Sequence, residues 1–256
     1  MHQNNEGYDT MKNNRVGTTF VTNEGCTVKV IAYNGVKDVT IEFIGYDYVR
    51  QGVSWNALQR GVVRNPMLRK EYGVGYFGEG PYKTATKAHN AWHNMMRRCY
   101  CQETRDKFPT YEQCIVCDEW HNFQNFAKWY EENYYEIDGQ TMCLDKDILI
   151  KNNKVYSPET CVIVPQHINK LFTKRQRFRS ECCIGVTLEK SGKYKAEHST
   201  NGQHNYLGTY DTLQQAFYAY KVFKENEIKR IADLYKQYLP QQLYDAMYNY
   251  EVEIND

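Results

Sequence analysis

Residues 143–169 have the sequence CLDKDILIKNNKVYSPETCVIVPQHIN, and this stretch decides the predicted fold of the centre of the chain. Its first apolar residues indicate a strand, and a turn at Lys151–Asn153 separates them from a second strand within VYSPETCVIVP. The segment QHINKLF that follows indicates a short helix. The stretch therefore predicts two strands followed by a helix.

This predicted ββα unit carries an acid on its first strand and an amide on its helix. Asp145 and Asn169 offer a carboxylate and a carbonyl oxygen, which suit a hard cation such as Mg²⁺ or Mn²⁺. A metal ion held there against a phosphate would stabilise charge on the leaving 3′ oxygen, while a nearby base deprotonates the attacking water. Short motifs also match by chance, and from spacing alone these residues are more simply explained as surface charges and loop residues.

The same stretch resembles the HNH motif of phage homing endonucleases. The similarity includes AWHNMMRRCY, PTY and DEWHNFQNFAKWYEEN upstream of it, so that it covers about residues 83–172. The resemblance implies a ββα-metal DNA endonuclease, with catalytic positions at Asp145, Lys146, Asn153 and Asn169. It implies Asp145 and Asn169 as the ligands of Mg²⁺ or Mn²⁺, and Asn153 as the residue that orients the first strand.

One position departs from the HNH pattern. The pattern places a general-base histidine directly after the acid, where this chain has Lys146. A lysine acts as a base only where burial or neighbouring groups lower its pKa. His167 is close in sequence, but its direction is not fixed by the sequence. Three hypotheses stay open: a metal-dependent endonuclease, a catalytically degenerate HNH scaffold that acts as a DNA-binding regulator, and a phage protein-interaction factor.

The helical region before the ββα unit has an apolar stripe and several cysteines. Ala88, Trp92, Met95, Met96 and Cys99 fall at helical spacing and predict a buried face. The opposite, solvated face is then expected to carry His93, Arg97 and Arg98. Zn²⁺ is an alternative metal here, because C-x-C and C-x₂-C spacings occur near His121; buried or incidental thiols explain them too. The cysteines concerned are Cys99, Cys101, Cys114 and Cys117.

Residues 184–224 resemble the ethylene-response-factor (apetala-type) DNA-binding domain, a three-stranded antiparallel sheet backed by one helix. Alternation along the strands predicts Tyr194, Ala196 and Leu207 on the face toward the helix. The resemblance implies that the outer face contacts double-stranded DNA in the major groove. The candidate contacts on that face are Thr187, Lys193, Lys195 and Tyr206. A sheet used only for packing is the alternative.

A basic run joins these two regions. Residues 170–179, KLFTKRQRFR, contain five basic residues and no acid, whereas the whole chain has a net charge of only +1. A cationic tether between two DNA-contacting units would add salt-dependent affinity for phosphates; a solvated linker is the alternative. The candidate phosphate contacts are Lys170, Lys174, Arg175, Arg177 and Arg179.

The N-terminal region shows the alternation of β-strands. Residues 17–66 contain period-2 runs joined at Asn34–Gly35, which predicts hairpins in a small β-barrel or meander. The region resembles, less specifically, a β-barrel that precedes such phage nuclease domains. Arg50, Arg60, Arg64 and Lys70 are its candidates for DNA contact.

These segments together predict an α+β, multidomain protein. The nine cysteines have no framework spacing, the N-terminus is polar, and no apolar run approaches about 20 residues, so we expect reduced thiols, no membrane span and a cytoplasmic location in a bacterial host. The predicted divisions are a disordered arm (1–15), a small β domain (16–71), a glycine-rich linker (72–82), an HNH-like ββα module with helices (83–172), a basic linker (173–182), and a C-terminal three-stranded sheet with a long helix (183–256).

Overall fold

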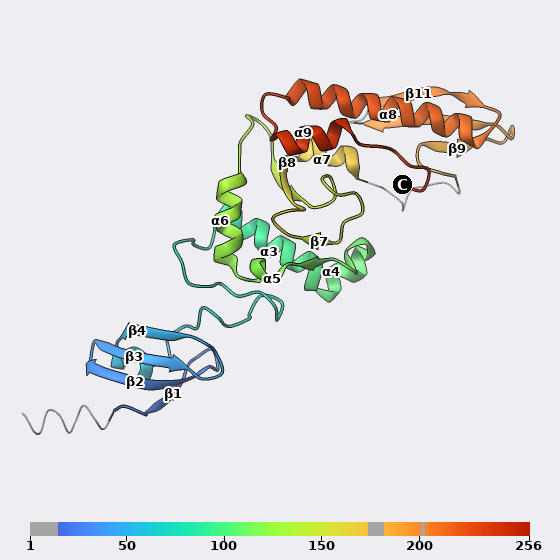
Figure 1. Cartoon of the computed structure of the whole chain (residues 1–256). Helices are drawn as coiled ribbons and strands as arrows, with labels where there is room; N and C mark the ends of the chain where they lie inside the picture. Colours follow the sequence, from blue (N-terminus) through green and yellow to red (C-terminus); the bar gives the residue numbers. More distant parts are fainter. Residues whose placement is uncertain (1–14, 174–181, 201–202) are drawn as a thin grey trace, which may run out of the picture. The chain divides into compact units, whose positions relative to one another are not determined.

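The computed structural model describes residues 15–173, 182–200 and 203–256, and it confirms a mixed α+β chain (Figure 1). Two compact units result from its internal contacts. The first comprises Met1–Thr84 and Glu119–Phe126, and the second Ala85–Asp118 and Ala127–Asp256. The predicted C-terminal domain therefore falls in the second unit, whereas the predicted HNH-like module is divided, because residues 83–84 and 119–126 belong to the first unit.

The first unit contains an antiparallel sheet in meander order. Its strands are β1 (Thr19–Val21), β2 (Thr27–Gly35), β3 (Asp38–Phe43) and β4 (Val49–Val53), followed by helix α2 (Trp55–Gln59). The predicted alternation is present, since Val28, Val30, Ile41 and Phe43 are fully buried in one core. Among the described residues β1 and β4 do not pair, so the sheet is a meander and not a closed barrel.

The glycine-rich segment also belongs to the first unit, where it is held against residues 119–126. Tyr76 forms a β-bridge with Asn122, and the Gln124 side chain donates to the carbonyl groups of Phe77 and Tyr82. Gly78 has a φ of +74°, and a Cβ at this position would collide with the Asn122 amide. The absence of a side chain is thus needed for close approach as well as for the backbone conformation.

The second unit begins with helix α3 (Lys87–Tyr100), which is capped by the Thr86 hydroxyl. Its apolar stripe is buried as predicted, with Trp92 and Met96 almost fully enclosed. The elements that follow are α4 (Gln102–Lys107), the 3₁₀ helix η1 (Pro109–Tyr111), β5 (Ile115–Val116), α5 (Asp118–His121) and α6 (Phe123–Asn133). The last two elements extend across the boundary between the units.

The stretch 143–169 contributes to two strands and a helix. β6 (Met142–Asp145) pairs antiparallel with β8 (Val162–Pro165), and α7 (Gln166–Phe172) follows directly. The loop between the strands contains β7 (Val155–Tyr156), which pairs in parallel with β5. The order strand, loop, strand, helix matches the sequence prediction, and the loop is fixed by pairing with an earlier segment.

The C-terminal region is a three-stranded antiparallel sheet covered by a long helix. The strands β9 (Val186–Leu188), β10 (Tyr194–Thr200) and β11 (Gln203–Tyr210) lie in the order β11-β10-β9. Helix α8 (Leu213–Tyr235) begins at a cap formed by Thr212. An additional helix, α9 (Gln241–Tyr248), begins after Pro240 and was not predicted.

Helix α8 contributes to two cores. Near its start, Ala216 packs with Ala196 and Val186 of the sheet. Further along, Ile228 and Ala232 join Leu243 and Met247 of α9 in a core with residues of β8 and α7. The C-terminal helices therefore complete the hydrophobic core of the ββα unit. Among the described residues, no helix has both the length and the apolar character that a membrane span requires.

Candidate functional site

Asp145 ends strand β6 and fixes the start of the loop that follows. Its Oδ1 accepts hydrogen bonds from the backbone N–H groups of Asp147 (2.7 Å) and Ile148 (2.8 Å). Burial raises the pKa of the Asp145 carboxyl, and these two donors act in the opposite direction. Among the described residues Oδ2 accepts no hydrogen bond, so this oxygen is the one left for a ligand.

Lys146 turns into the interior of the loop. Only 4 % of the residue is exposed, and its Nζ lies 2.7 and 2.8 Å from the two carboxylate oxygens of Asp147 and 2.7 Å from the carbonyl oxygen of Asn153. An ammonium group has three hydrogens, and here three acceptors lie around it. The arrangement leaves neither a lone pair nor a free hydrogen for a water molecule beside Asp145.

Asn153 joins the two ends of this loop. Its Nδ2 donates to the carbonyl oxygens of Lys146 (2.9 Å) and Val155 (2.6 Å), and its Oδ1 accepts from the Val155 N–H (3.1 Å). All three bonds go to backbone atoms. The amide therefore holds the residue after β6 next to the first residue of β7.

Asn169 reaches β6 from helix α7. Its Nδ2 lies 3.3 Å from the sulfur of Cys143, and that thiol also lies 3.3 Å from the carbonyl oxygen of Val164 on the paired strand. Cys143 and Asp145 are two residues apart on β6, so their side chains leave the same face of the strand. Burial raises the pKa of Cys143, Asp145 raises it further, and Asn169 and Arg98 lower it. Asn169 thus contacts Cys143, and the charges of Asp145 and Arg98 act on the same thiol.

His167 does not belong to this site. It lies two residues before Asn169, which places the two side chains on different faces of α7. Its ring packs on Tyr235 of α8 with a centroid distance of 4.9 Å, and neither ring nitrogen has a hydrogen-bond partner within the described part of the chain. Burial lowers the pKa of His167, with a further contribution from Lys170. This histidine is a core residue against α8.

Arg98 differs from the expectation for its helix face. Arg97 is exposed as expected, but Arg98 points inward, and its guanidinium lies 5.7 Å from the ring centroid of Tyr111. Burial lowers the pKa of Arg98, while Tyr156, Tyr111 and Cys143 raise it by more. The prediction that Arg98 lies on the solvated face is therefore wrong. The packing of α3 against the β5–β7 region encloses this last turn.

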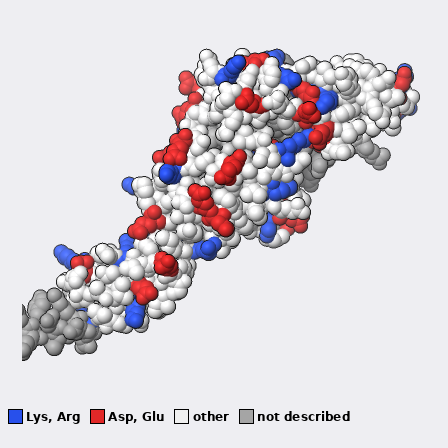
Figure 2. Space-filling model, viewed as in Figure 1, with Lys and Arg blue, Asp and Glu red and all other residues white. Residues whose placement is uncertain are grey.

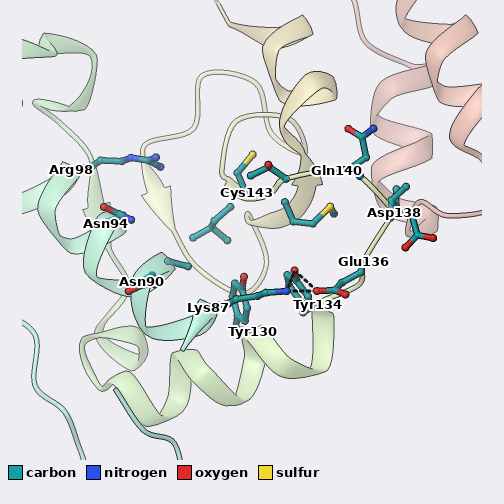
Figure 3. Close-up of a pocket in the computed structure, with 16 residues that line it drawn as sticks. Lys87, Asn90, Asn94, Arg98, Tyr130, Tyr134, Glu136, Asp138, Gln140 and Cys143 are labelled. Carbon is teal, nitrogen blue, oxygen red and sulfur yellow. Dashed lines mark hydrogen bonds and ion pairs between the residues drawn. The ribbon is translucent and has the colours of Figure 1, made fainter. Parts of the chain in front are cut away.

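A pocket of about 500 Å³ extends from Arg98 along helix α3 (Figure 3). One wall is the α3 face, with Lys87, Asn90 and Asn94 preceding Arg98. Tyr130 and Tyr134 of α6, the segment 136–141 and the start of β6 form the rest. Sequence reasoning missed this pocket, because its polar α3 residues have the spacing that a solvated helix face would show.

The predicted DNA-contacting lysines of the C-terminal sheet have acidic partners. Lys193 lies 3.0 Å from Asp211, and Lys195 lies 3.0 Å from Glu197. Both pairs are solvent-exposed, so each holds its lysine weakly. A phosphate that reached this face would compete with a carboxylate for each cation.

The remaining predicted DNA contacts have varied surroundings. Thr187 is half-buried, whereas Tyr206 is 66 % exposed and lies 2.9 Å from the Thr209 hydroxyl. Lys170 is exposed in the last turn of α7. Lys174, Arg175, Arg177 and Arg179 lie outside the described residues.

The N-terminal candidates lie in the first unit. Arg50 donates to the carbonyl oxygen of Arg64 (3.3 Å), and Lys70 forms an ion pair with Glu24. Arg60 is the C-cap residue of α2. On the face that Figure 2 shows, Lys and Arg side chains alternate with Asp and Glu, as the near-zero net charge leads one to expect.

The cysteines of the zinc alternative lie in different surroundings. Cys99 and Cys114 are buried, and burial raises the pKa of both thiols. Cys101 differs, because hydrogen bonds from the side chain and the backbone of Thr104 lower the pKa of its thiol. Within the described part of the chain, no group of three or more His, Cys, Asp or Glu side chains is arranged to hold a metal ion. Zn²⁺, like Mg²⁺ or Mn²⁺ at Asp145 and Asn169, stays a prediction.

Comparisons with family models, with characterised proteins and with solved structures give no match to this chain.

Proposed function

We propose that this protein binds double-stranded DNA on an HNH-like ββα scaffold that has lost the general base of the nuclease reaction. The observation that carries the proposal is the environment of Lys146, whose three hydrogens face Asp147 and the Asn153 carbonyl group. The position after the acid is where the HNH resemblance implies the base. A cation that is fully engaged in the loop interior cannot take a proton from water.

DNA binding is supported by three features of different kinds. The first is the pair of family resemblances, and the second is the basic run that begins at Lys170. The third is the Arg98 guanidinium, which lines the same pocket as Cys143 of β6, where a phosphate of a strand lying on β6 would meet a cation. In this proposal the protein acts as a phage-type DNA-binding regulator, and its ββα unit positions the bound DNA strand.

A metal-dependent HNH endonuclease is the second candidate. The Oδ2 of Asp145 favours it, because among the described residues this oxygen accepts no hydrogen bond, and Asp145 leaves the same face of β6 as Cys143, which Asn169 contacts. A carboxylate and an amide oxygen there could hold Mg²⁺ or Mn²⁺. In that case metal-bound hydroxide would have to replace the missing base. The two candidates therefore differ in a single property, which is cleavage.

Supercoiled plasmid incubated with Mg²⁺ or Mn²⁺ separates the candidates. We expect gel-shift binding without metal-dependent nicking, both in the wild type and in Asp145→Ala. Nicking by the wild type that Asp145→Ala abolishes would establish the endonuclease and overturn the first proposal. If about four phosphates are contacted, the affinity should fall about 100-fold between roughly 0.05 and 0.2 M salt. An affinity that does not depend on salt would count against DNA binding itself.

Lys146→His tests the role of the missing base directly. It restores the residue type that the HNH resemblance implies, and Lys146→Gln is the matched control because it removes the same charge. We expect metal-dependent nicking from Lys146→His and none from Lys146→Gln. Failure of both, with DNA binding intact, would show that the site has lost more than its base.

A further inference from the structure

The pocket along helix α3 has two ends that differ in charge balance (Figure 3). At one end Lys87 forms an ion pair with Glu136 and a hydrogen bond with Tyr134. At the other end Arg98 points toward Cys143, with Asn94 one turn before it on the helix. The acidic wall residues, Glu136 and Asp138, lie toward the Lys87 end.

The charge of Arg98 has no carboxylate partner in the described part of the chain. The side chains that raise its pKa most are those of Tyr156, Tyr111 and Cys143, and no carboxylate is among them. A largely buried guanidinium without a counter-charge is costly in a folded protein. A bound anion would remove that cost, so this end of the pocket is built to accept one.

We infer that the Arg98 end of the pocket binds the phosphate group of a nucleotide. A guanidinium matches phosphate geometry with two parallel hydrogen bonds, and the amide of Asn94 adds a donor from the same helix face. The pocket's volume of about 500 Å³ is within the range of sites for small ligands. Tyr130 and Tyr134, stacked with a centroid distance of 5.2 Å, give the opposite wall an aromatic surface that suits a base.

The phosphate could belong to a free mononucleotide or to a nucleotide of a DNA strand. The inference rests on the proposed DNA binding only for the second source. A terminal or unstacked nucleotide fits a pocket of this size, whereas paired bases within a duplex do not leave their stack without cost. The direct probe is therefore thymidine 5′-monophosphate, with thymidine and inorganic phosphate as comparison ligands.

The experiment is titration calorimetry on the full chain with these three ligands. We expect thymidine 5′-monophosphate to bind, inorganic phosphate to bind more weakly, and thymidine to bind at least about tenfold more weakly than its monophosphate, because it lacks the group that Arg98 recognises. Equal affinity for thymidine and its monophosphate would overturn the inference. So would the absence of detectable binding of the monophosphate.

Three variants then locate the site. Arg98→Gln should weaken binding of the monophosphate about tenfold or more, while Arg97→Gln removes the same charge from the exposed neighbour and should leave the affinity unchanged. Asn94→Asp should abolish binding with the fold retained, because it places a carboxylate four residues before Arg98. Equal losses in Arg98→Gln and Arg97→Gln, or full binding by Asn94→Asp, would overturn the assignment to this pocket.

A gel shift with the same variants distinguishes the two sources of phosphate. If the nucleotide belongs to a strand, Arg98→Gln should weaken binding of a 5′-phosphorylated single strand more than Arg97→Gln does. If only free nucleotides enter, the two variants should bind DNA equally. Mononucleotide binding by a wild type that does not bind DNA would uphold this inference while overturning the proposed function.

Discussion

Within the described residues, the central ββα unit and helix α8 each contain one buried lysine, and the two lysines have opposite surroundings. Lys146 is 4 % exposed and forms an ion pair with Asp147 at 2.7 Å. Lys224 is 9 % exposed, and its Nζ lies 3.3 Å from Nε2 of His198. Burial lowers the pKa of Lys224 to about 8, with Glu227 acting in the opposite direction. The two lysines are thus similarly buried, but Lys146 is held by a carboxylate, whereas the pKa of Lys224 is lowered.

This difference indicates which of the two lysines meets the conditions for accepting a proton as a general base. A lysine can act as a base near neutral pH when burial lowers its pKa and no carboxylate is beside it. Lys224 approaches that condition, but it lies on α8 with its Nζ beside His198 of β10. Lys146 stands at the position implied for the base, but a carboxylate holds it. The surroundings, and not the residue type, decide the role of each lysine.

Replacing the paired lysine should have the largest effect on stability. Lys146→Met leaves the Asn153 carbonyl oxygen and the Asp147 carboxylate without their donor, and we expect a loss of about 3 kcal/mol in the free energy of unfolding. Larger losses are not expected, because the Asp147 side chain is 48 % exposed and can be solvated. Lys154→Met, in the exposed part of the same loop, is the control and should cost about 0.5 kcal/mol or less. Equal losses in urea unfolding would show that the ion pair contributes nothing specific.

The buried histidine beside Lys224 should make stability depend on pH. Burial and, to a smaller extent, the neighbouring Lys224 lower the pKa of His198 from 6.5 to about 4. Between these values the unfolded chain binds the proton and the folded chain does not, so stability is full above pH 6.5 and is lost as the pH falls toward 4. We expect a loss of about 2 kcal/mol over this window, after allowance for solvent screening. Urea unfolding between pH 4 and 7 measures it.

The control for the pH effect is His198→Asn, whose carbonyl oxygen can still accept from Lys224. This variant should lose less stability in acid than the wild type. A residual slope is expected, because burial also lowers the pKa of His167. Identical pH profiles for the wild type and His198→Asn would show that His198 is not responsible.

Replacing Lys224 should change the free energy of unfolding by less than replacing Lys146, and in the opposite direction. Lys224→Met removes a buried charge that has no ion-pair partner at hydrogen-bond distance among the described residues, so we expect stability at pH 7 to stay unchanged or to rise by up to about 1 kcal/mol. The pKa of His198 should rise at the same time, because the neighbouring cation is gone. Nuclear magnetic resonance titration of the histidines measures this rise. A large loss of stability, comparable to that of Lys146→Met, would contradict the comparison.

The sequence predicted those parts of the fold that depend on a single element. Alternation along β2 and β3 and the stripe on α3 were visible because one face of each element is buried. Strand β4 was not predicted, since four of its five residues are exposed and no alternation exists. Helix α9 was not predicted either, because its eight residues are too few for a clear helical pattern. The spacing of Leu243 and Met247, four residues apart, is a signal that could have indicated it.

The candidate site was predictable only in part, for a physical reason. Asp145, Lys146, Asn153 and Asn169 lie within 25 residues of one another and were found from local spacing. Arg98 could not be found in this way, because its environment is created by segments far along the chain, including Tyr156 and Cys143. A helix face looks solvated in sequence until the elements that cover it are placed. The pairing of Lys146 with Asp147 was equally invisible, since adjacent residues on a regular strand point apart.

The variant with the smallest expected effect, Asn94→Asp, gives Arg98 a carboxylate partner of the kind that Lys146 already has in Asp147. Asn94→Asp places an acid four residues before Arg98 on α3, in the orientation that favours an ion pair on a helix, and we expect a gain of about 0.3–0.5 kcal/mol. The gain should decrease in urea unfolding at high salt, because the pair is partly solvated. Asn90→Asp, one turn earlier, is the control and should give a smaller gain because it lies two turns from Arg98. A loss of stability in Asn94→Asp would mean that the charge of Arg98 is already balanced, and then neither the contrast with Lys146 nor the need for a bound anion would hold.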